Sequence, residues 1–249
     1  MAEDRDRAQR QAHHGVGAVL SVVVGFVVVF GAWVGVRSLA NLGYEPATLT
    51  ATDPAGQHHV SLELQSYPNS YPCHGSASGA PGGGADPSWV TFCPSTSLQV
   101  PAHSVVTMTI LQYDTPTTLH NRFFDKVRGT LGGAMSLNGF PVTGVRASDV
   151  AHTFTLQSLP TKAASHYTYL FVSVPLVGVA KGAPNAVTIA GHQYPKPNVI
   201  RFRFRTGSPG TYVWHCYDPC GTGLGGYQHG FGGPMATTGY MSGTLTVVG

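Results

Sequence analysis

The strongest constraint on the fold is an alternation of apolar and charged residues over 200–205, Ile-Arg-Phe-Arg-Phe-Arg. Successive side chains of a β-strand point to opposite faces. The pattern therefore predicts a strand whose apolar residues face a core and whose arginines, Arg201, Arg203 and Arg205, face water. Shorter alternating segments occur at 60–64, 106–110, 153–156 and 244–248. The 32 glycines and 18 prolines supply turns between them,. Strands at this spacing predict an all-β sandwich or barrel.

An uncharged segment of 22 residues, 15–36, precedes these strands. As a helix it would extend roughly 33 Å, which is enough to cross the hydrocarbon core of a bilayer. Arginines are more frequent before this segment than after it, and this bias predicts a cytoplasmic N-terminus,. A cleaved signal peptide is the alternative, because 38–40, Ser-Leu-Ala, is similar to a cleavage site. We expect an uncleaved, single-pass anchor that places the C-terminal domain outside the cytoplasm.

These features predict four parts in the chain. An insertion rich in Gly and Pro interrupts the last part near residues 66–98. The parts are a cytoplasmic tail at 1–14, a transmembrane anchor at 15–37, a linker at 38–59 and a β-domain at 60–249.

Composition and motifs exclude several classes of function. The formal net charge is only +3 and no basic cluster stands out, so nucleic-acid binding is not indicated,. The sequence also lacks a nucleophile elbow, a His-Glu-x-x-His motif and a glycine loop of the phosphate-binding type. We therefore do not expect a hydrolase.

The four cysteines fall into two pairs. Cys73 and Cys93 bracket a loop of small residues, and in an oxidising compartment this pair predicts a disulfide. Closing a loop of about 20 residues would stabilise the fold by roughly 3 kcal/mol. Two buried thiols are the alternative.

The other cysteine pair lies in a C-terminal segment with several metal-capable side chains. This segment contains Cys216, Cys220, His229, Met235 and Met241. Thiolate, imidazole and thioether together form the ligand set that soft copper prefers. An upstream histidine would complete the set. The candidates are His120, which follows a predicted strand, and His152, which begins one.

Three segments resemble the cupredoxin superfamily, and within it the copper-binding domain of cytochrome c oxidase subunit II. The segment Asp-Val-Ala-His-Thr-Phe at 149–154 is similar to the family's Asp-Val-x-His-x-Phe. The segment Pro-Gly-Thr-Tyr at 209–212, followed by the Cys-x3-Cys pair, is similar to its second motif. Met-Ser-Gly-Thr-Leu-Thr-Val at 241–247 is similar to its closing strand.

The resemblance implies a cupredoxin-like Greek-key fold and a centre of one or two copper ions. Cys216 and Cys220 would bind as thiolates, His152 would be the upstream imidazole, and Asp218 would lend its backbone carbonyl. In the family a histidine follows the second cysteine by four residues, but here Leu224 stands at that position and the next histidine is His229. The loop is therefore longer than in the family, and Met235 and Met241 both compete for the thioether role.

These observations favour a membrane-anchored, copper-binding electron carrier. It would accept electrons from an external donor and pass them to a membrane redox partner such as an oxidase core. Such a chain would be an electron-transfer protein or an oxidase subunit rather than a catalyst by itself. Two alternatives stay open: a blue-type single-copper protein or copper storage and delivery protein, and a metal-free interaction module with a Cys216–Cys220 disulfide.

Overall fold

A computed structural model shows that the predicted all-β class is correct, because almost every regular element is a strand. Three short helices complete the described part of the chain: α2 (Tyr71–His74), η1 (Arg122–Asp125) and η2 (Ala147–Asp149). The structure describes residues 44–46, 48–52, 56–74, 89–158, 169–218, 233–235 and 237–249.

The first sheet has six strands in the order β1-β5-β15-β14-β9-β10. Parallel and antiparallel neighbours are mixed, since β15 pairs with β5 in parallel and with β14 in antiparallel fashion. The strands are β1 (Tyr44–Pro46), β5 (Ser97–Pro101), β9 (Val150–Ser158), β10 (Phe171–Val177), β14 (Gly210–His215) and β15 (Ser242–Val248).

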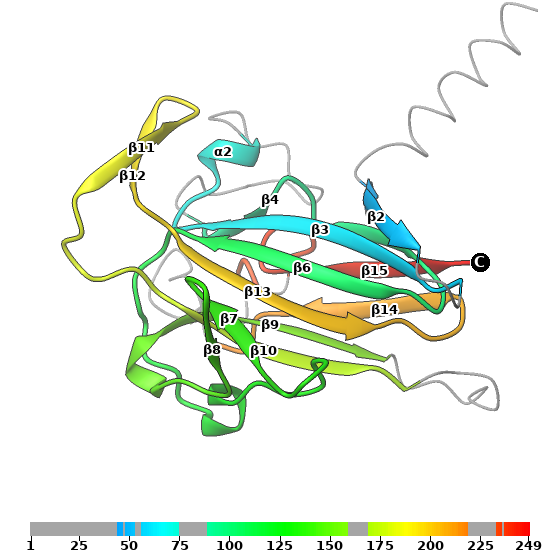
Figure 1. The fold of residues 1–249 in the computed structure, drawn as a ribbon. Coiled ribbons are helices and arrows are strands. Elements are labelled where there is room, and N and C mark those ends of the chain that lie inside the picture. Colours follow the sequence, from blue (N-terminus) through cyan, green and yellow to red (C-terminus); the bar gives the residue numbers. More distant parts are fainter. Residues whose placement is uncertain are drawn as a thin grey trace, which may run out of the picture. The chain divides into compact units, whose positions relative to one another are not determined.

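The second sheet has seven strands in the order β2-β3-β6-β13-β7-β8, with β4 also paired to β3. Its central strands, β3, β6 and β13, are the longest and can be followed across Figure 1. The strands are β2 (Thr48–Thr52), β3 (His58–Tyr67), β4 (Thr91–Cys93), β6 (Val105–Gln112), β7 (Met135–Leu137), β8 (Phe140–Val142) and β13 (Asn198–Arg205).

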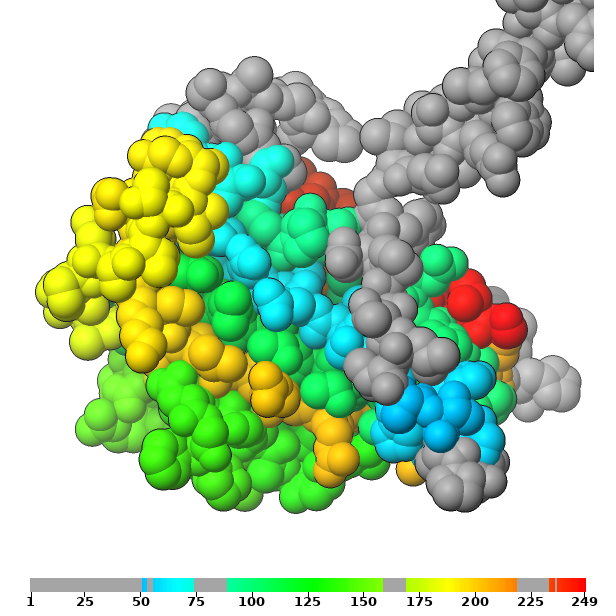
Figure 2. Space-filling view, turned by 45° about the horizontal axis from the view of Figure 1, so that its top comes forward, coloured from blue at the N-terminus to red at the C-terminus, as the bar shows by residue number. Residues whose placement is uncertain are grey.

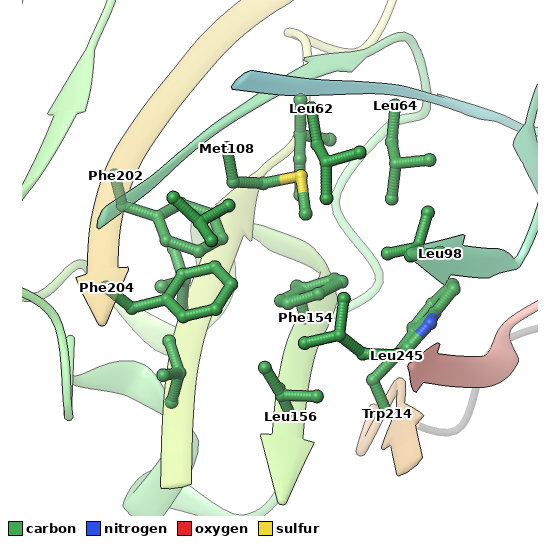
Figure 3. Close-up of a cluster of buried hydrophobic side chains, with 14 of the residues drawn as sticks. Leu62, Leu64, Leu98, Met108, Phe154, Leu156, Phe202, Phe204, Trp214 and Leu245 are labelled. Carbon is green, nitrogen blue, oxygen red and sulfur yellow. The ribbon is translucent and has the colours of Figure 1, made fainter. Parts of the chain in front are cut away.

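The two sheets form a sandwich with one main core between them. Aromatic side chains from opposite sheets meet there, and the rings of Phe154 and Phe202 lie 5.7 Å apart between centroids. Trp214 packs on Phe154 and donates its indole N–H to the Thr96 carbonyl at 3.1 Å. Figure 3 shows the side chains of Leu62, Leu64, Met108, Phe202 and Phe204 facing Leu98, Phe154, Leu156, Trp214 and Leu245.

The alternating segments form strands as predicted. In β13 the burial pattern follows the sequence pattern, with Ile200, Phe202 and Phe204 buried and the arginines between them exposed. Figure 2 shows the face of the molecule on which β3 (cyan) and β13 (orange) run, with the β11–β12 hairpin (yellow) at one end. That hairpin pairs β11 (Asn185–Ile189) with β12 (His192–Pro195).

Two strands lie inside residues 38–59, the segment expected to be a linker. β1 pairs with β5 and β2 pairs with β3, so this segment contributes a strand to each sheet. The β1 pairing depends on a strand about 50 residues further along the chain, whereas β2 forms a local antiparallel hairpin with β3, in which Thr52 pairs with His58. The predicted transmembrane anchor lies outside the described residues, and within them no helix is both long enough and apolar enough to cross a membrane.

The predicted disulfide is present. It joins Cys73 to Cys93, with their Cα atoms 5.7 Å apart. It packs at one end of the sandwich against three buried tyrosines, Tyr67, Tyr113 and Tyr194, of which Tyr67 and Tyr113 stack at 4.7 Å. The bridge thus ties α2 and β4 together within the region interpreted as an insertion near 66–98.

Candidate metal centre

Two adjacent strands bring His152 and Cys216 together. β9 pairs with β14 with Trp214 opposite Leu156 and His215 opposite Thr155, so the residues that follow β14 lie beside the start of β9. Two hydrogen bonds hold this continuation in place. Cys216 N–H donates to the Met241 carbonyl at 2.9 Å, and Tyr217 N–H donates to the Thr153 hydroxyl at 2.7 Å.

The sulfur of Cys216 lies in a dry and polar environment. The residue is only 1% exposed. The Thr153 N–H donates to its Sγ at 3.3 Å, and the His152 side chain also hydrogen-bonds it. N–H donors stabilise negative charge on an acceptor, so the Thr153 contact would support the thiolate form that binds metals. As a thiol, Cys216 donates to the Asp218 carbonyl at 3.4 Å.

His152 is completely buried and its side chain hydrogen-bonds both Asp114 and Cys216. Its Nε2 donates to Asp114 Oδ2 at 3.0 Å. Burial alone lowers the pKa of His152, but the hydrogen bonds and charges of Asp114 and Cys216 outweigh burial and raise that pKa to about 10. With Nε2 bonded to Asp114, Nδ1 is the ring nitrogen through which His152 would bind a metal together with Cys216. A carboxylate in this position fixes both the orientation and the tautomer of a metal-binding imidazole.

Asp114 is a residue of this cluster that the sequence analysis missed. It directly follows Tyr113 in the loop after β6, where its Oδ1 accepts from Thr115 N–H at 2.7 Å and its carbonyl accepts from Val179 N–H at 2.8 Å. These bonds hold the side chain at the end of the strand. A carboxylate immediately after a buried strand, in the same loop as His120, is the signal that could have identified it.

Asp218 is buried beside the same pair. Its backbone carbonyl lies 3.4 Å from Cys216 Sγ, which is the part of the residue expected to contribute. Its carboxylate accepts a hydrogen bond from the Thr117 hydroxyl, which also donates to the Ala151 carbonyl at 3.1 Å. Burial raises the pKa of Asp218 to about 6, while the Thr117 hydrogen bond opposes that change.

Both candidate methionines are buried in the main core together with Cys216. Met241 is fully buried, and its carbonyl accepts from Cys216 N–H; Met235 is 5% exposed. His215, the strand neighbour of Cys216, hydrogen-bonds the Met235 backbone and is half-buried. The thioether ligand stays a prediction for either methionine.

Of the remaining candidates, the structure describes His120. It is exposed and lies close enough to Asp218 for its charge to lower the pKa of that carboxyl. His152 is the histidine that hydrogen-bonds Cys216. Cys220 and His229 lie outside the described residues. Among the residues that the structure does describe, no three His, Cys, Asp or Glu side chains converge as a complete metal site.

The described part of the cluster has the chemistry that copper requires. It combines a buried sulfur with amide support, an imidazole fixed by a carboxylate, a backbone carbonyl near the sulfur and two buried thioethers. Soft sulfur donors together with imidazole suit copper better than the oxygen-preferring cations. The residues therefore fit a copper ion, with Cys216 and His152 as the donors that the structure brings together.

No protein-family model matches the chain, and no curated protein matches it in sequence. Auracyanin B matches at 17% identity and a TM-score of 0.30, over 81% of this chain and 95% of that chain. Rusticyanin from Thiobacillus ferrooxidans matches at 11% identity and a TM-score of 0.27, over 81% of this chain and 87% of that chain. A multicopper oxidase matches at 10% identity and a TM-score of 0.26, over 80% of this chain and 46% of that chain. TM-scores of this size do not establish a shared fold.

Proposed function

We propose that this chain is a copper-binding electron-transfer protein of the cupredoxin type. The observation that carries the proposal is the buried contact between His152 and Cys216, with Asp114 fixing the far side of the imidazole. A bound copper ion would supply one-electron chemistry by alternating between Cu(I) and Cu(II). His152 and Cys216 would hold the ion, with Met235 or Met241 as the thioether and Cys220 and His229 completing the site.

The chain's own residues would keep the site dry and fixed. Asp114 holds the ring of His152, and the Thr153 N–H holds the sulfur of Cys216. Ligands that are buried and fixed by hydrogen bonds limit rearrangement when the charge of the metal changes. The surrounding apolar core restricts the access of water and so helps to set the potential.

The finer assignment follows the motif resemblance. On this proposal the centre is of the oxidase subunit II type, and residues 15–37 anchor the chain with its β-domain outside the cytoplasm. An external donor would deliver electrons and a membrane redox partner would receive them.

Copper loading of the full-length chain tests the proposal. Reconstitution with Cu(II) should give strong visible absorption from thiolate-to-copper charge transfer. A blue species with a four-line EPR spectrum would indicate one copper, and a purple species with a seven-line spectrum would indicate two. A colourless product with intact, reduced cysteines would refute electron transfer at this site. Mass analysis of the thiols would identify the metal-free module if Cys216 and Cys220 are oxidised.

Substitutions of the proposed ligands test which residues bind the copper ion. Cys216→Ser and His152→Gln should abolish the visible bands, because each removes a proposed donor. Met135→Leu is the matched control for Met235→Leu and Met241→Leu, since Met135 is equally buried and lies in β7. One of the two site variants should shift the spectrum, while Met135→Leu should leave it unchanged. Unchanged colour in Cys216→Ser would overturn the assignment.

A further inference from the structure

A continuous series of aromatic rings leads from Cys216 to the protein surface. Tyr217 follows Cys216 directly, and the ring of Phe124 stacks on it with centroids 4.7 Å apart and planes 8° apart. Phe123 contacts Phe124 edge-on at 5.1 Å. Phe123 is 47% exposed. The series therefore begins at the proposed copper ligand and ends in solvent.

The exposed end of this series is surrounded by positive charge. The guanidinium of Arg128 lies 4.2 Å from the centroid of the Phe123 ring, in a cation–π arrangement,. Arg122 and Lys126 are also exposed, with 75% and 56% of their side chains accessible. The one acid in this segment, Asp125, has a side chain that is only 3% exposed. We call Arg122, Phe123, Lys126 and Arg128 the basic aromatic patch.

The patch is fixed to the sandwich by its backbone. Arg128 exchanges two hydrogen bonds with Ser173 of β10, at 2.8 and 2.9 Å. The Val145 N–H donates to the Asp125 carbonyl at 2.9 Å, and the Val127 N–H donates to the Thr143 carbonyl at 2.9 Å. The side chains of the patch thus extend from a segment that is tied to the edge of the first sheet.

We propose that the basic aromatic patch is the docking surface for an acidic redox protein, and that Phe123, Phe124 and Tyr217 connect that partner to Cys216. The proposal rests on the proposed copper function. Exposed cations would steer a partner whose docking face carries carboxylates, and Phe123 would supply an apolar contact. One electron passes in each encounter: the donor is oxidised by one electron, and Cu(II) is reduced to Cu(I). No bond forms or breaks.

The first test maps anion docking without any need for copper. Hexacyanochromate(III), a paramagnetic and redox-inert trianion, is titrated into the isotope-labelled full-length chain. Amide NMR signals of residues 122–128 should broaden first. The double variant Lys126→Gln/Arg128→Gln should lose this broadening, while the charge-matched control Arg201→Gln/Arg203→Gln on β13 should keep it. Broadening that is equal at both sites, or strongest near β13, would overturn the docking surface.

The second test measures electron transfer from hexacyanoferrate(II) to the copper-loaded chain. At low salt, the Lys126→Gln/Arg128→Gln variant should react about tenfold more slowly, because two steering charges are lost. Arg122 is left intact in this design because its Nε donates a hydrogen bond to the buried Asp125 at 3.1 Å, whereas Lys126 Nζ lies further from that carboxylate, at 3.6 Å. The β13 control should react at the wild-type rate.

The aromatic connection is tested separately from the charges. Phe124→Leu removes a ring but keeps an apolar side chain, so it should slow electron transfer severalfold while anion broadening stays intact. Tyr217→Phe keeps the ring and should retain the rate, whereas Tyr217→Leu should lower it. Unfolding midpoints confirm that each variant is folded. A wild-type rate in folded Phe124→Leu and Tyr217→Leu would refute the connection. Failure to bind copper would instead refute the proposed function, and the anion map would still decide the docking surface.

Discussion

β9 and β13 differ in the solvent exposure of their two faces. β13 buries every second residue and exposes the arginines between them. In β9 all of residues 150–156 are buried, including His152, Thr153 and Thr155. On the second face of β9, Tyr217 hydrogen-bonds Thr153 through its N–H and Gln157 through its hydroxyl. Phe124 stacks on the Tyr217 ring. A strand covered on both faces can hold polar groups away from water, provided that each finds a partner.

The two strands share one core, and the largest expected effects lie there. Phe154 of β9 and Phe202 of β13 are both buried and lie 5.7 Å apart. Phe154→Ala and Phe202→Ala should each lower the free energy of unfolding by about 3–5 kcal/mol, because each leaves a cavity. Urea denaturation measures both losses. A cost below about 1 kcal/mol for either would mean that the strand does not contribute equally to the core.

The Asp114–His152 contact tests whether the buried polar groups of β9 hold the metal site. Asp114→Ala should weaken copper binding by about 10- to 100-fold, because the imidazole loses the carboxylate that orients it. Asp114→Asn should have a smaller effect, since the amide oxygen can still accept from Nε2. Competition with a chelator of known affinity measures both.

The control for these variants is Asp149→Asn. Asp149 lies in the same motif as His152, but its carboxylate pairs with the exposed Arg146 at 2.8 Å rather than with the site. Copper affinity should therefore match that of the wild type. If Asp149→Asn and Asp114→Ala weaken binding equally, the positioning role of Asp114 is wrong.

Buried polar contacts on β9 should also matter away from the metal. The hydroxyls of Thr155 and Ser173 are both buried and lie 3.0 Å apart. Thr155→Val should cost about 1–3 kcal/mol, because the Ser173 hydroxyl is left buried without this partner. Adding Ser173→Ala should recover part of that loss, and a thermal unfolding series measures the difference. A double variant that is less stable than the single one would contradict this account.

The contrast between the strands also explains what the sequence could predict. In β13 the alternation of apolar and charged residues determines which face is buried. Both the strand and the side of it that faces solvent can therefore be predicted from the sequence alone. In β9 the predicted inner face, His152, Phe154 and Leu156, is correct, but the burial of Thr153 and Thr155 depends on distant segments. Local patterns do not encode which loop covers a second face.

The same limit applies to the candidate site. The motif around His152 and Cys216 identified two residues that the structure brings together. Asp114 was missed because its role depends on a contact across 38 residues of sequence, between a loop and a strand. β1 was missed for a related reason, since it is short and pairs with β5, which is remote in sequence. β2 is also short, but it pairs with the adjacent strand β3, so its absence from the prediction reflects the weakness of its short alternating pattern rather than a remote partner.

The smallest expected effect is on the outer face of β13. Arg203 is exposed, its strand partner is Thr107 of β6, and its side chain lies on the opposite face of β13 from Phe202, which packs against β9. Arg203→Ala should change the free energy of unfolding by no more than about 0.5 kcal/mol, because an exposed side chain without a structural role contributes little. Copper affinity should not change. Urea denaturation of Arg203→Ala beside Thr155→Val compares the two strands directly. Equal losses would mean that the outer face of β13 is covered in solution, as both faces of β9 are. In that case β13 would not differ from β9, and the distinction between a strand that only encloses the core and one that also holds the site would be wrong.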